Sequence, residues 1–264
     1  PPFDYFAADS IEAAVQALAD AGGDGKIIAG GQSLMPMLNF RLLRPSVLID
    51  INRIPDLAYV RDDGECIRIG PLTRHRTLET SSLVAEQLPV LHEAMGYVAH
   101  LAIRNRGTIG GSLSHADPAA ELPMMSLLLD ARLEIQSLSG RRTIDARDFF
   151  LGALTTDLDE GEMLVEVRLT KLRKGTGWAF EEVARRSGDF ALASVGITLS
   201  HDDGKISNVR IGLMGVGETP MRATDAESLL AGQPFSETVV TAAVDSIRRT
   251  VEPNTDLHAS SDYR

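Results

Sequence analysis

The sequence predicts an α+β protein with a larger N-terminal part and a smaller C-terminal part. Up to about residue 173, short apolar runs of strand length alternate with amphipathic helical patterns. From residue 174 onward, three strand patterns come before two helical patterns, which is typical of a separate α+β module. A length of 264 residues, of which 44% are hydrophobic, gives each part enough apolar side chains for a core of its own.

The N-terminal segment has the pattern of a small α/β unit. Ser10 is suited to cap a helix whose apolar residues recur at helical spacing until a Gly-Gly pair ends it. Two short apolar runs follow, each of the length and composition of a buried strand. We therefore expect one helix and two strands, over residues 11–21, 26–29 and 47–51.

The middle segment mixes strands with helices. The turn Asp62-Asp63-Gly64-Glu65 separates two strand-like runs, and Ser139-Gly140-Arg141 joins two others in a hairpin. A long helical pattern between these turns is interrupted near Pro89. The expected strands cover residues 59–60, 67–70, 133–136, 142–144 and 163–169, and the expected helices cover residues 83–101 and 121–129.

The C-terminal segment has the simplest pattern of the three. Strands are expected over residues 178–184, 193–199 and 206–213, and helices over residues 222–230 and 237–250. We therefore divide the chain into a domain over residues 1–173, with subdomains of about 1–55 and 56–173, and a second domain over residues 174–264.

Composition excludes several classes of function. A net charge of −11 argues against binding to nucleic acid or to an anionic membrane, since both need basic patches. The single cysteine, Cys66, permits neither an intrachain disulfide nor an iron–sulfur site of cysteines. The uncharged stretches are too short to span a bilayer, and no signal peptide opens the chain, so we expect a cytoplasmic protein.

Two glycine-rich segments, far apart in sequence, are the strongest functional signal. The first is Ala29-Gly30-Gly31-Gln32-Ser33-Leu34, and the second runs from Gly107 to Pro118 around Thr108-Ile109-Gly110-Gly111. A Gly-Gly step lets the backbone approach a ligand closely, and the hydroxyls and bare amides that follow suit phosphate oxygens. Two such loops predict a diphosphate held from both sides. Neither the Rossmann fingerprint nor the P-loop motif is present.

The histidines do not predict a metal site. None of the six has ligand spacing, and capping or solvent exposure is the simpler interpretation of His92 and His100. For His115, directly after Ser114, two interpretations stay open: an exposed side chain, or one that stands beside a bound cofactor.

Two charged pairs also keep two interpretations each. Asp117 and Glu121 flank Pro118, where they serve as helix N-cap and first-turn acid, as acceptors for ribose or ribityl hydroxyls, or as both. Arg185 and Arg186 are either solvated or close to a flavin, where they would stabilise negative charge on its reduced ring.

These residues resemble the FAD-binding medium subunits of the molybdenum hydroxylases, which include those of aerobic carbon monoxide dehydrogenase and nicotine dehydrogenase and the flavin domain of xanthine dehydrogenase. Ala29 to Leu34 is similar to the first flavin loop of that family, and Thr108 to Pro123 to the second. Glu182 to Ala191 resembles the loop near the isoalloxazine, and Gly217 to Gly232 the start of the C-terminal domain. Four motifs in the family's order cover nearly the whole chain.

The resemblance implies a two-subdomain FAD-binding fold of the vanillyl-alcohol-oxidase/PCMH type, followed by a smaller α+β domain. By the match, FAD contacts come from Ala29, Gly30, Gly31, Gln32, Ser33, Leu34, Thr108, Ile109, Gly110 and Gly111 at the diphosphate, from Ser112, Ser114, Asp117 and Glu121 at the sugar and ribityl chain, and from Leu164 near the ring. Relatives often carry Asp or Asn in place of Ser112, and a lysine around Glu181 or Glu182.

The resemblance also implies the function of an electron-transfer subunit with no catalytic acid or base of its own. A large molybdopterin subunit would oxidise the organic substrate and a small subunit would hold [2Fe–2S] clusters. This chain would pass the electrons from FAD to an external acceptor, within a dimer of heterotrimers. The alternatives are a self-contained FAD oxidoreductase and a non-enzymatic binding module whose Gly-Gly steps are only turns.

Overall fold

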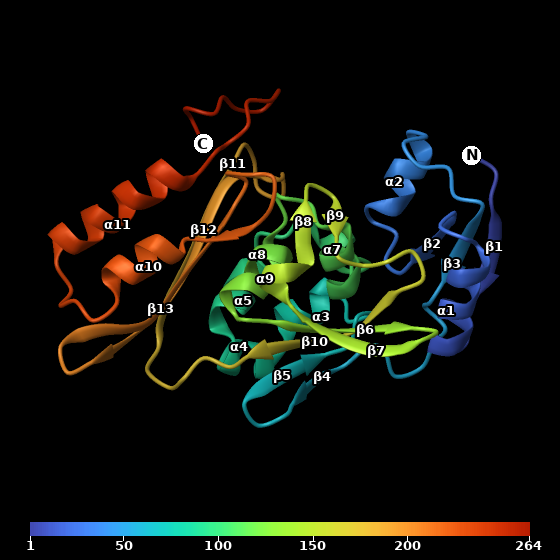
Figure 1. Ribbon diagram of the computed structural model, residues 1–264, viewed down its shortest axis with the longest axis horizontal. Coiled ribbons are helices and arrows are strands. Elements are labelled where there is room, and N and C mark those ends of the chain that lie inside the picture. The colour runs from blue at the N-terminus through green and yellow to red at the C-terminus, as the bar shows by residue number, and fades with distance from the viewer.

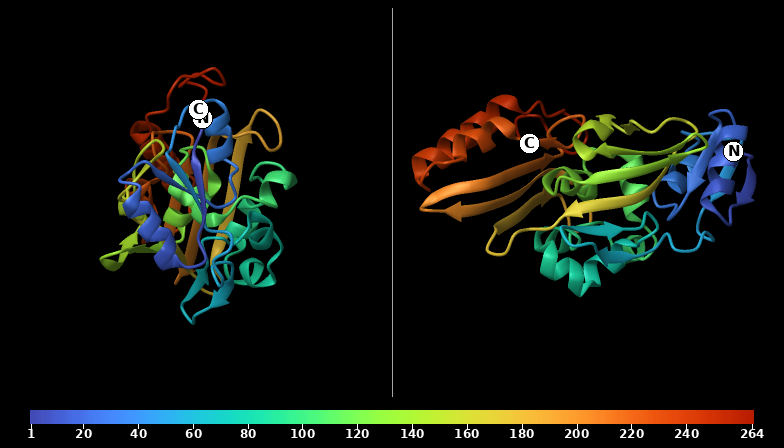
Figure 2. Two further views of the ribbon diagram at one scale, coloured as in Figure 1. Left: turned by 90° about the vertical axis from the view of Figure 1, so that its right-hand side faces the viewer. Right: turned by 60° about the horizontal axis from the view of Figure 1, so that its bottom comes forward.

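The computed structural model describes residues 1–264 as an elongated molecule with three main sheets in a row (Figure 1). The right-hand view of Figure 2 shows the N-terminal sheet at one end, the C-terminal sheet at the other, and a middle part between them. The predicted α+β class is confirmed.

The N-terminal unit is a parallel sheet in the order β1-β3-β2, covered by α1. Ser10 caps α1 as predicted, since its hydroxyl accepts a hydrogen bond from the Ala13 amide at 3.1 Å. The sequence did not predict β1, most of which is exposed, or α2, which contains Pro36. The bounds are β1 Asp4–Ala7, α1 Ile11–Asp20, β2 Gly25–Ile28, α2 Leu34–Asn39 and β3 Val47–Asp50.

The middle part is built on an antiparallel sheet in the order β4-β5-β10-β6-β7. Its central strand β10 is buried along most of its length, and the predicted hairpin is confirmed by the pairing of β6 with β7. The strands are β4 Val60–Asp62, β5 Cys66–Ile69, β6 Arg132–Ser137, β7 Gly140–Asp145 and β10 Met163–Thr170, with a small hairpin of β8 Phe150–Gly152 and β9 Thr155–Thr156.

The helical segment predicted over residues 83–101, with an interruption near Pro89, is confirmed in outline, and the structure divides it into short helices. Pro89 begins a new helix, and Ala99 has a left-handed φ of +42°, which a continuous helix cannot contain. The helices of the middle part are α3 His75–Thr80, α4 Ser82–Gln87, α5 Pro89–Ala94, α6 Leu101–Arg104, α7 Ile109–His115, α8 Glu121–Leu128 and α9 Ala146–Phe149.

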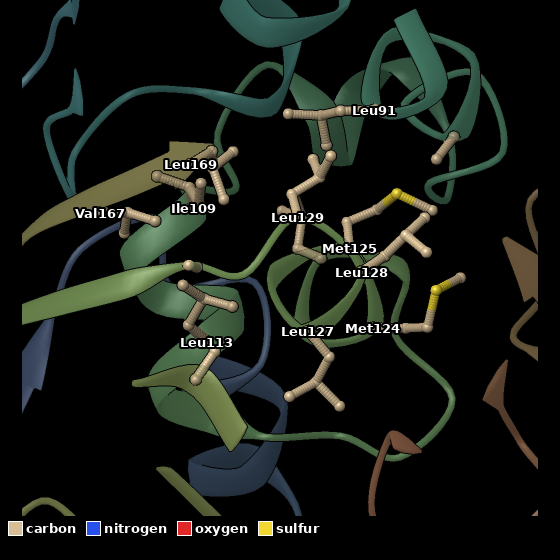
Figure 3. Packing of buried hydrophobic residues seen from close by; sticks show 14 of the residues in the cluster. Leu91, Ile109, Leu113, Met124, Met125, Leu127, Leu128, Leu129, Val167 and Leu169 are labelled. Atoms are coloured by element: carbon tan, nitrogen blue, oxygen red, sulfur yellow. The ribbon is translucent and has the colours of Figure 1, made fainter. Parts of the chain in front are cut away.

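Helix α8 is buried on all sides and joins the middle part to the C-terminal part. Met124, Met125 and Leu128 lie in the main hydrophobic core, which also receives side chains from α5, α7 and β10 (Figure 3). Gly196 and Gly212 of the C-terminal sheet let α8 come close. A Cβ at these positions would lie 2.9 Å from Leu128 Cδ2 and 2.8 Å from Met124 Sδ.

The C-terminal part is an antiparallel sheet in the order β11-β12-β13-β14, with α10 and α11 on the face opposite α8 (Figure 1). Arg222 fixes it to the middle part, since its guanidinium donates to Asp130 Oδ1 at 2.9 Å and to the Leu127 carbonyl at 3.1 Å. The three predicted strands and two helices are confirmed as β11 Gly177–Ala184, β12 Ala191–Asp202, β13 Lys205–Met214, α10 Thr224–Leu230 and α11 Glu237–Thr250, with a short β14 at Met221–Arg222. None of the helices combines the length and the apolar composition needed to cross a bilayer.

Candidate cofactor-binding site

The first glycine segment is an ordered loop between β2 and α2. Gly31 has a left-handed φ of +71°, a conformation that glycine adopts without steric cost. The Gln32 side chain donates to the Gly30 carbonyl at 3.0 Å, and Asn52 at the end of β3 donates to the Ala29 carbonyl at 2.8 Å. These two hydrogen bonds fix the conformation of the loop.

The loop leaves backbone donors free for a ligand. The N–H groups of Gly30, Gly31, Gln32 and Ser33 make no hydrogen bond within the protein. The loop borders a cavity of about 340 Å³, which is also lined by Asp50, Asn52, Met35 and Arg106. Free amides of this kind suit phosphate oxygens, and Arg106 adds a positively charged residue to the lining of the same cavity.

Asp50 is a candidate ligand that the sequence analysis did not single out. Partial burial opposes its ionisation, but hydrogen bonds from Tyr5 and Asn52 hold its pKa below the ordinary value. An ionised carboxylate at the carboxyl end of a parallel strand is suited to accept from ribose hydroxyls. The position of Asp50, directly after the buried run 47–49, was the available signal.

The second glycine segment is not the open loop that we predicted. Residues Ile109–His115 form α7, and Thr108 caps it by accepting the Gly111 amide at 3.1 Å. The amides of Ile109 and Gly110 donate to the carbonyls of Thr73 and Pro71 at 3.1 and 2.9 Å. The prediction of bare amides is therefore wrong here, and the free donors come from the first segment.

The structure brings the two glycine segments into contact. A Cβ on Gly30 would lie 2.2 Å from the Arg106 carbonyl oxygen, so only glycine permits this approach. Arg74 secures the junction, because its guanidinium donates to the Arg106 carbonyl and, at 2.8 Å, to Asn52 Oδ1. Although the two segments are about 75 residues apart in sequence, they form one site.

Gly110 and Gly111 have different surroundings. A Cβ on Gly110 would lie 2.6 Å from Pro71 Cβ, so this glycine is required by packing. Gly111 is exposed, and a Cβ there would meet only Thr108 Oγ1, at 2.9 Å. The missing side chain of Gly111 therefore leaves exposed backbone at the first turn of α7 rather than space that the fold requires.

The polar residues near α7 are only partly engaged. The hydroxyls of Ser33, Ser112 and Ser114 make no hydrogen bond within the protein, so they are free to meet a ligand. Asp117 is not the helix N-cap, which is Ala120. Its carboxylate instead accepts from the Ala119 amide at 2.9 Å.

Three other predicted residues lie deeper. Glu121 is only 8% exposed, and burial, reinforced by the charges of Glu182 and Asp117, raises its pKa to about 8. Leu164 is 3% exposed in the main core and lines neither cavity described here. His115 is half-buried, which lowers its pKa.

A second cavity, of about 600 Å³, lies between α3, α5 and β11. Along β11, Phe180 is buried and Glu181 is exposed, while Glu182 is half-buried and lines the cavity. The alternation of the strand thus identifies Glu182 as the inward member of the Glu181–Glu182 pair. Sequence reasoning alone did not distinguish the two.

The turn over residues 98–100 lies beside the loop that follows β11. Arg104 donates to the carbonyls of Val98 and Ala99, both at 2.8 Å, and its Nε donates to Glu79 at 2.9 Å. The loop after β11 packs on this turn, since a Cβ on Gly188 would lie 2.4 Å from His100 Nδ1. Arg186 from that loop also lines the cavity.

Comparison with known proteins gives this site its context. A model of the FAD binding domain in molybdopterin dehydrogenase matches residues 1–171, and one of the CO dehydrogenase flavoprotein C-terminal domain matches residues 178–264. The alpha subunit of the 6-hydroxypseudooxynicotine dehydrogenase complex of Paenarthrobacter nicotinovorans is 46% identical, covering 100% of this chain and 90% of the relative.

Solved structures agree along the whole chain. A carbon monoxide dehydrogenase chain from Hydrogenophaga pseudoflava superposes with a TM-score of 0.97 at 41% identity, covering 100% of this chain and 92% of that one. A chain of quinoline 2-oxidoreductase from Pseudomonas putida 86 does so with a TM-score of 0.93 at 39% identity, covering 100% and 91%.

The site geometry fits the cofactor that these family models specify. Free amides at residues 30–33, in a cavity that Arg106 also lines, suit the diphosphate of FAD, and the Asp50 carboxylate suits a ribose. From this fit and the matches along its length, the chain belongs to the FAD-binding medium subunits of the molybdenum hydroxylases, an oxidoreductase family.

Proposed function

We propose that this chain is the electron-transfer subunit of a heterotrimeric molybdenum hydroxylase. It would take electrons from the [2Fe–2S] clusters of a small subunit, which is fed by a large molybdopterin subunit that oxidises the substrate. It would then pass them to an external acceptor. The observation that carries the proposal is the cavity beside the contact of Gly30 with Arg106, whose free amides suit a diphosphate.

The chain's own residues bind and orient the cofactor. Residues 29–34 and 108–111 hold the diphosphate, chiefly through the free amides of the first loop. Ser112, Ser114, Asp117 and Glu121 serve the sugar and ribityl chain, and Leu164 packs near the ring. When bound, FAD supplies a store for two electrons.

The chemistry on the organic substrate belongs to partner subunits. With one cysteine, this chain cannot ligate the clusters itself. We expect a dimer of heterotrimers in the cytoplasm, with the chain divided into an FAD-binding domain over residues 1–173 and a C-terminal domain over residues 174–264.

Anaerobic bleaching of the flavin tests the proposal. The isolated chain loaded with FAD and the native assembly are each mixed with compounds of the kind for which relatives are named, such as quinoline and carbon monoxide. We expect an active compound to bleach the flavin of the assembly and to leave that of the isolated chain oxidised. Bleaching of the isolated chain would favour a self-contained oxidoreductase, and a chain that binds no FAD would favour a binding module.

A further inference from the structure

Two acids, the buried Glu121 and the half-buried Glu182, come from different parts of the molecule and approach the same junction. Glu121 begins α8, and Met124, Met125 and Leu128, three, four and seven residues later, are the side chains that meet the C-terminal sheet. Glu121 therefore lies on the helix face that packs on this sheet.

Glu182 reaches the junction from the sheet. It pairs with Ser194 of β12, and the neighbouring pair on the same face is Phe180 with Gly196, which lies against α8. The side chain of Glu182 thus points to the same side of the sheet as α8. One of its carboxyl oxygens, Oε2, is buried without a hydrogen-bond partner.

Neither carboxyl group has a cationic partner. Glu121 and Glu182 take part in no ion pair, and the nearest cation that acts on Glu121 is Arg104. The Arg104 guanidinium is already engaged by Glu79 and by two backbone carbonyls. Partial or full burial without a cationic partner favours the protonated form of both carboxyl groups.

We propose that Glu121 and Glu182 form a two-carboxyl proton relay between the solvent of the 600 Å³ cavity and the buried side of the FAD site. Glu182 lines the cavity, so it exchanges protons with water there, and Glu121 hands them inward from the start of α8. The inference rests on the proposed function, because it takes Glu121 to lie beside the cofactor.

The relay matches the proton requirement of the flavin. Conversion of FAD to FADH2 takes up two electrons, which the proposed iron–sulfur partner supplies, and two protons, which must come from water. In each of two successive cycles, Glu121 gives up one carboxyl proton, Glu182 restores it, and cavity water restores Glu182. Both acids end protonated, and reoxidation of the cofactor runs the same transfers in reverse.

The pKa values of both acids lie close to neutral pH. Burial raises the pKa of Glu182 to about 7 and that of Glu121 to about 8, the latter also raised by Glu182 and Asp117 and lowered by Arg104. The other charged or titratable groups around the cavity are Arg76, Glu79, His92, Glu93, Tyr97 and Arg186. Arg76 pairs with Glu79 at 2.9 Å, so it does not neutralise Glu182.

The first test follows the carboxyl C=O stretch of the full chain by infrared spectroscopy against pH. We expect two carboxyl groups to lose their protons close to neutral pH. Glu182→Gln should remove one of them and shift the pKa of the other downward, because the charge of Glu182 no longer opposes ionisation of Glu121. Glu181→Gln, on the exposed side of the same strand, should leave both unchanged. Titration of all carboxyl groups in the ordinary acid range would overturn the relay.

The second test measures the midpoint potential of bound FAD against pH. We expect the slope of the wild-type midpoint potential against pH to change at the pH values where the two acids lose their protons. This change of slope should be lost in Glu182→Gln and kept in Glu181→Gln. An FAD-loaded Glu182→Gln chain with an unchanged curve would overturn the relay and leave the proposed function intact. Failure of the wild-type chain to bind FAD would instead contradict the proposed function.

Discussion

At the scale of single residues, the glycines of the two Gly-Gly steps have distinct physical roles. Gly30 touches the Arg106 carbonyl beside the second segment, Gly110 touches Pro71, Gly31 has a left-handed φ, and a Cβ on the exposed Gly111 would meet only Thr108 Oγ1. Gly111 is therefore the one of the four where a side chain disturbs the fold least.

Gly111→Ala should weaken FAD binding tenfold or more, about 1.4 kcal/mol, with little net change in the stability of the apo-protein. Alanine is the better helix former by about 1 kcal/mol, which offsets the shift that its Cβ imposes on Thr108 Oγ1, 2.9 Å away. Titration with FAD and thermal unfolding of the apo-protein measure the two effects separately.

Gly161→Ala is the matched control, since a Cβ there meets nothing within 4 Å. It should bind FAD normally, whereas Gly110→Ala should lose stability. Normal FAD affinity in Gly111→Ala would contradict the assignment of that surface to the cofactor.

His75 gives the fold a dependence on acid. Its ring lies against Gly107, neither ring nitrogen has a hydrogen-bond partner, and burial lowers its pKa to about 4 from 6.5. Between these values the unfolded chain binds the additional proton, so stability is present above pH 6.5 and is lost as pH falls towards 4. The loss should reach about 3 kcal/mol.

Urea unfolding at pH 7, 5.5 and 4 measures this loss. Glutamine does not titrate in that range. In His75→Gln, the total loss of unfolding free energy between pH 6.5 and 4 should therefore be smaller than in the wild type by the same amount. An identical slope in the two proteins would show that His75 is not the group responsible.

At this scale the sequence predicted residue types better than residue roles. The Gly-Gly steps and their hydroxyls were visible as motifs, but Asp50 and Arg106 join the site only through packing between distant segments. The inward position of Glu182 follows from the pairing of β11 with β12, which sequence spacing alone does not give.

At the scale of elements, α7 is where local propensity and tertiary structure disagree most. The run Gly110-Gly111-Ser112 has low helix propensity, which is why we predicted a loop. Ile109 and Leu113 are buried in the main core, and Thr108 caps the first turn (Figure 3). Packing and capping together outweigh the propensity.

The cap can be tested by removing the Thr108 hydroxyl. Thr108→Ala should cost about 1 kcal/mol of unfolding free energy and should also reduce FAD affinity, since the first turn of α7 borders the cofactor site. Ser10→Ala is a matched control, because Ser10 caps α1 with a hydrogen bond of the same length, 3.1 Å. It should lose similar stability and keep its FAD affinity.

Thr108→Ser should keep the unfolding free energy and the FAD affinity of the wild type, because serine retains the hydroxyl oxygen. Chemical denaturation and FAD titration of the three variants give the result. Equal FAD affinity in Thr108→Ala and Ser10→Ala would place α7 away from the cofactor.

At the scale of the whole molecule, strand and helix patterns predicted the α+β class and the change of pattern near residue 175. They did not predict how the parts are joined, because the junction depends on contacts between α8 and two glycines of the C-terminal sheet. That junction places Glu121 and Glu182 on facing surfaces of two parts of the chain.

The most direct test of the central claim is to purify the native assembly through a tag on this chain and determine its cofactors and subunit masses. We predict one FAD per copy of this chain, together with a larger molybdenum-bearing subunit and a smaller iron–sulfur subunit. A yellow chain without partners, or a colourless protein, would contradict the assignment of this chain as an electron-transfer subunit.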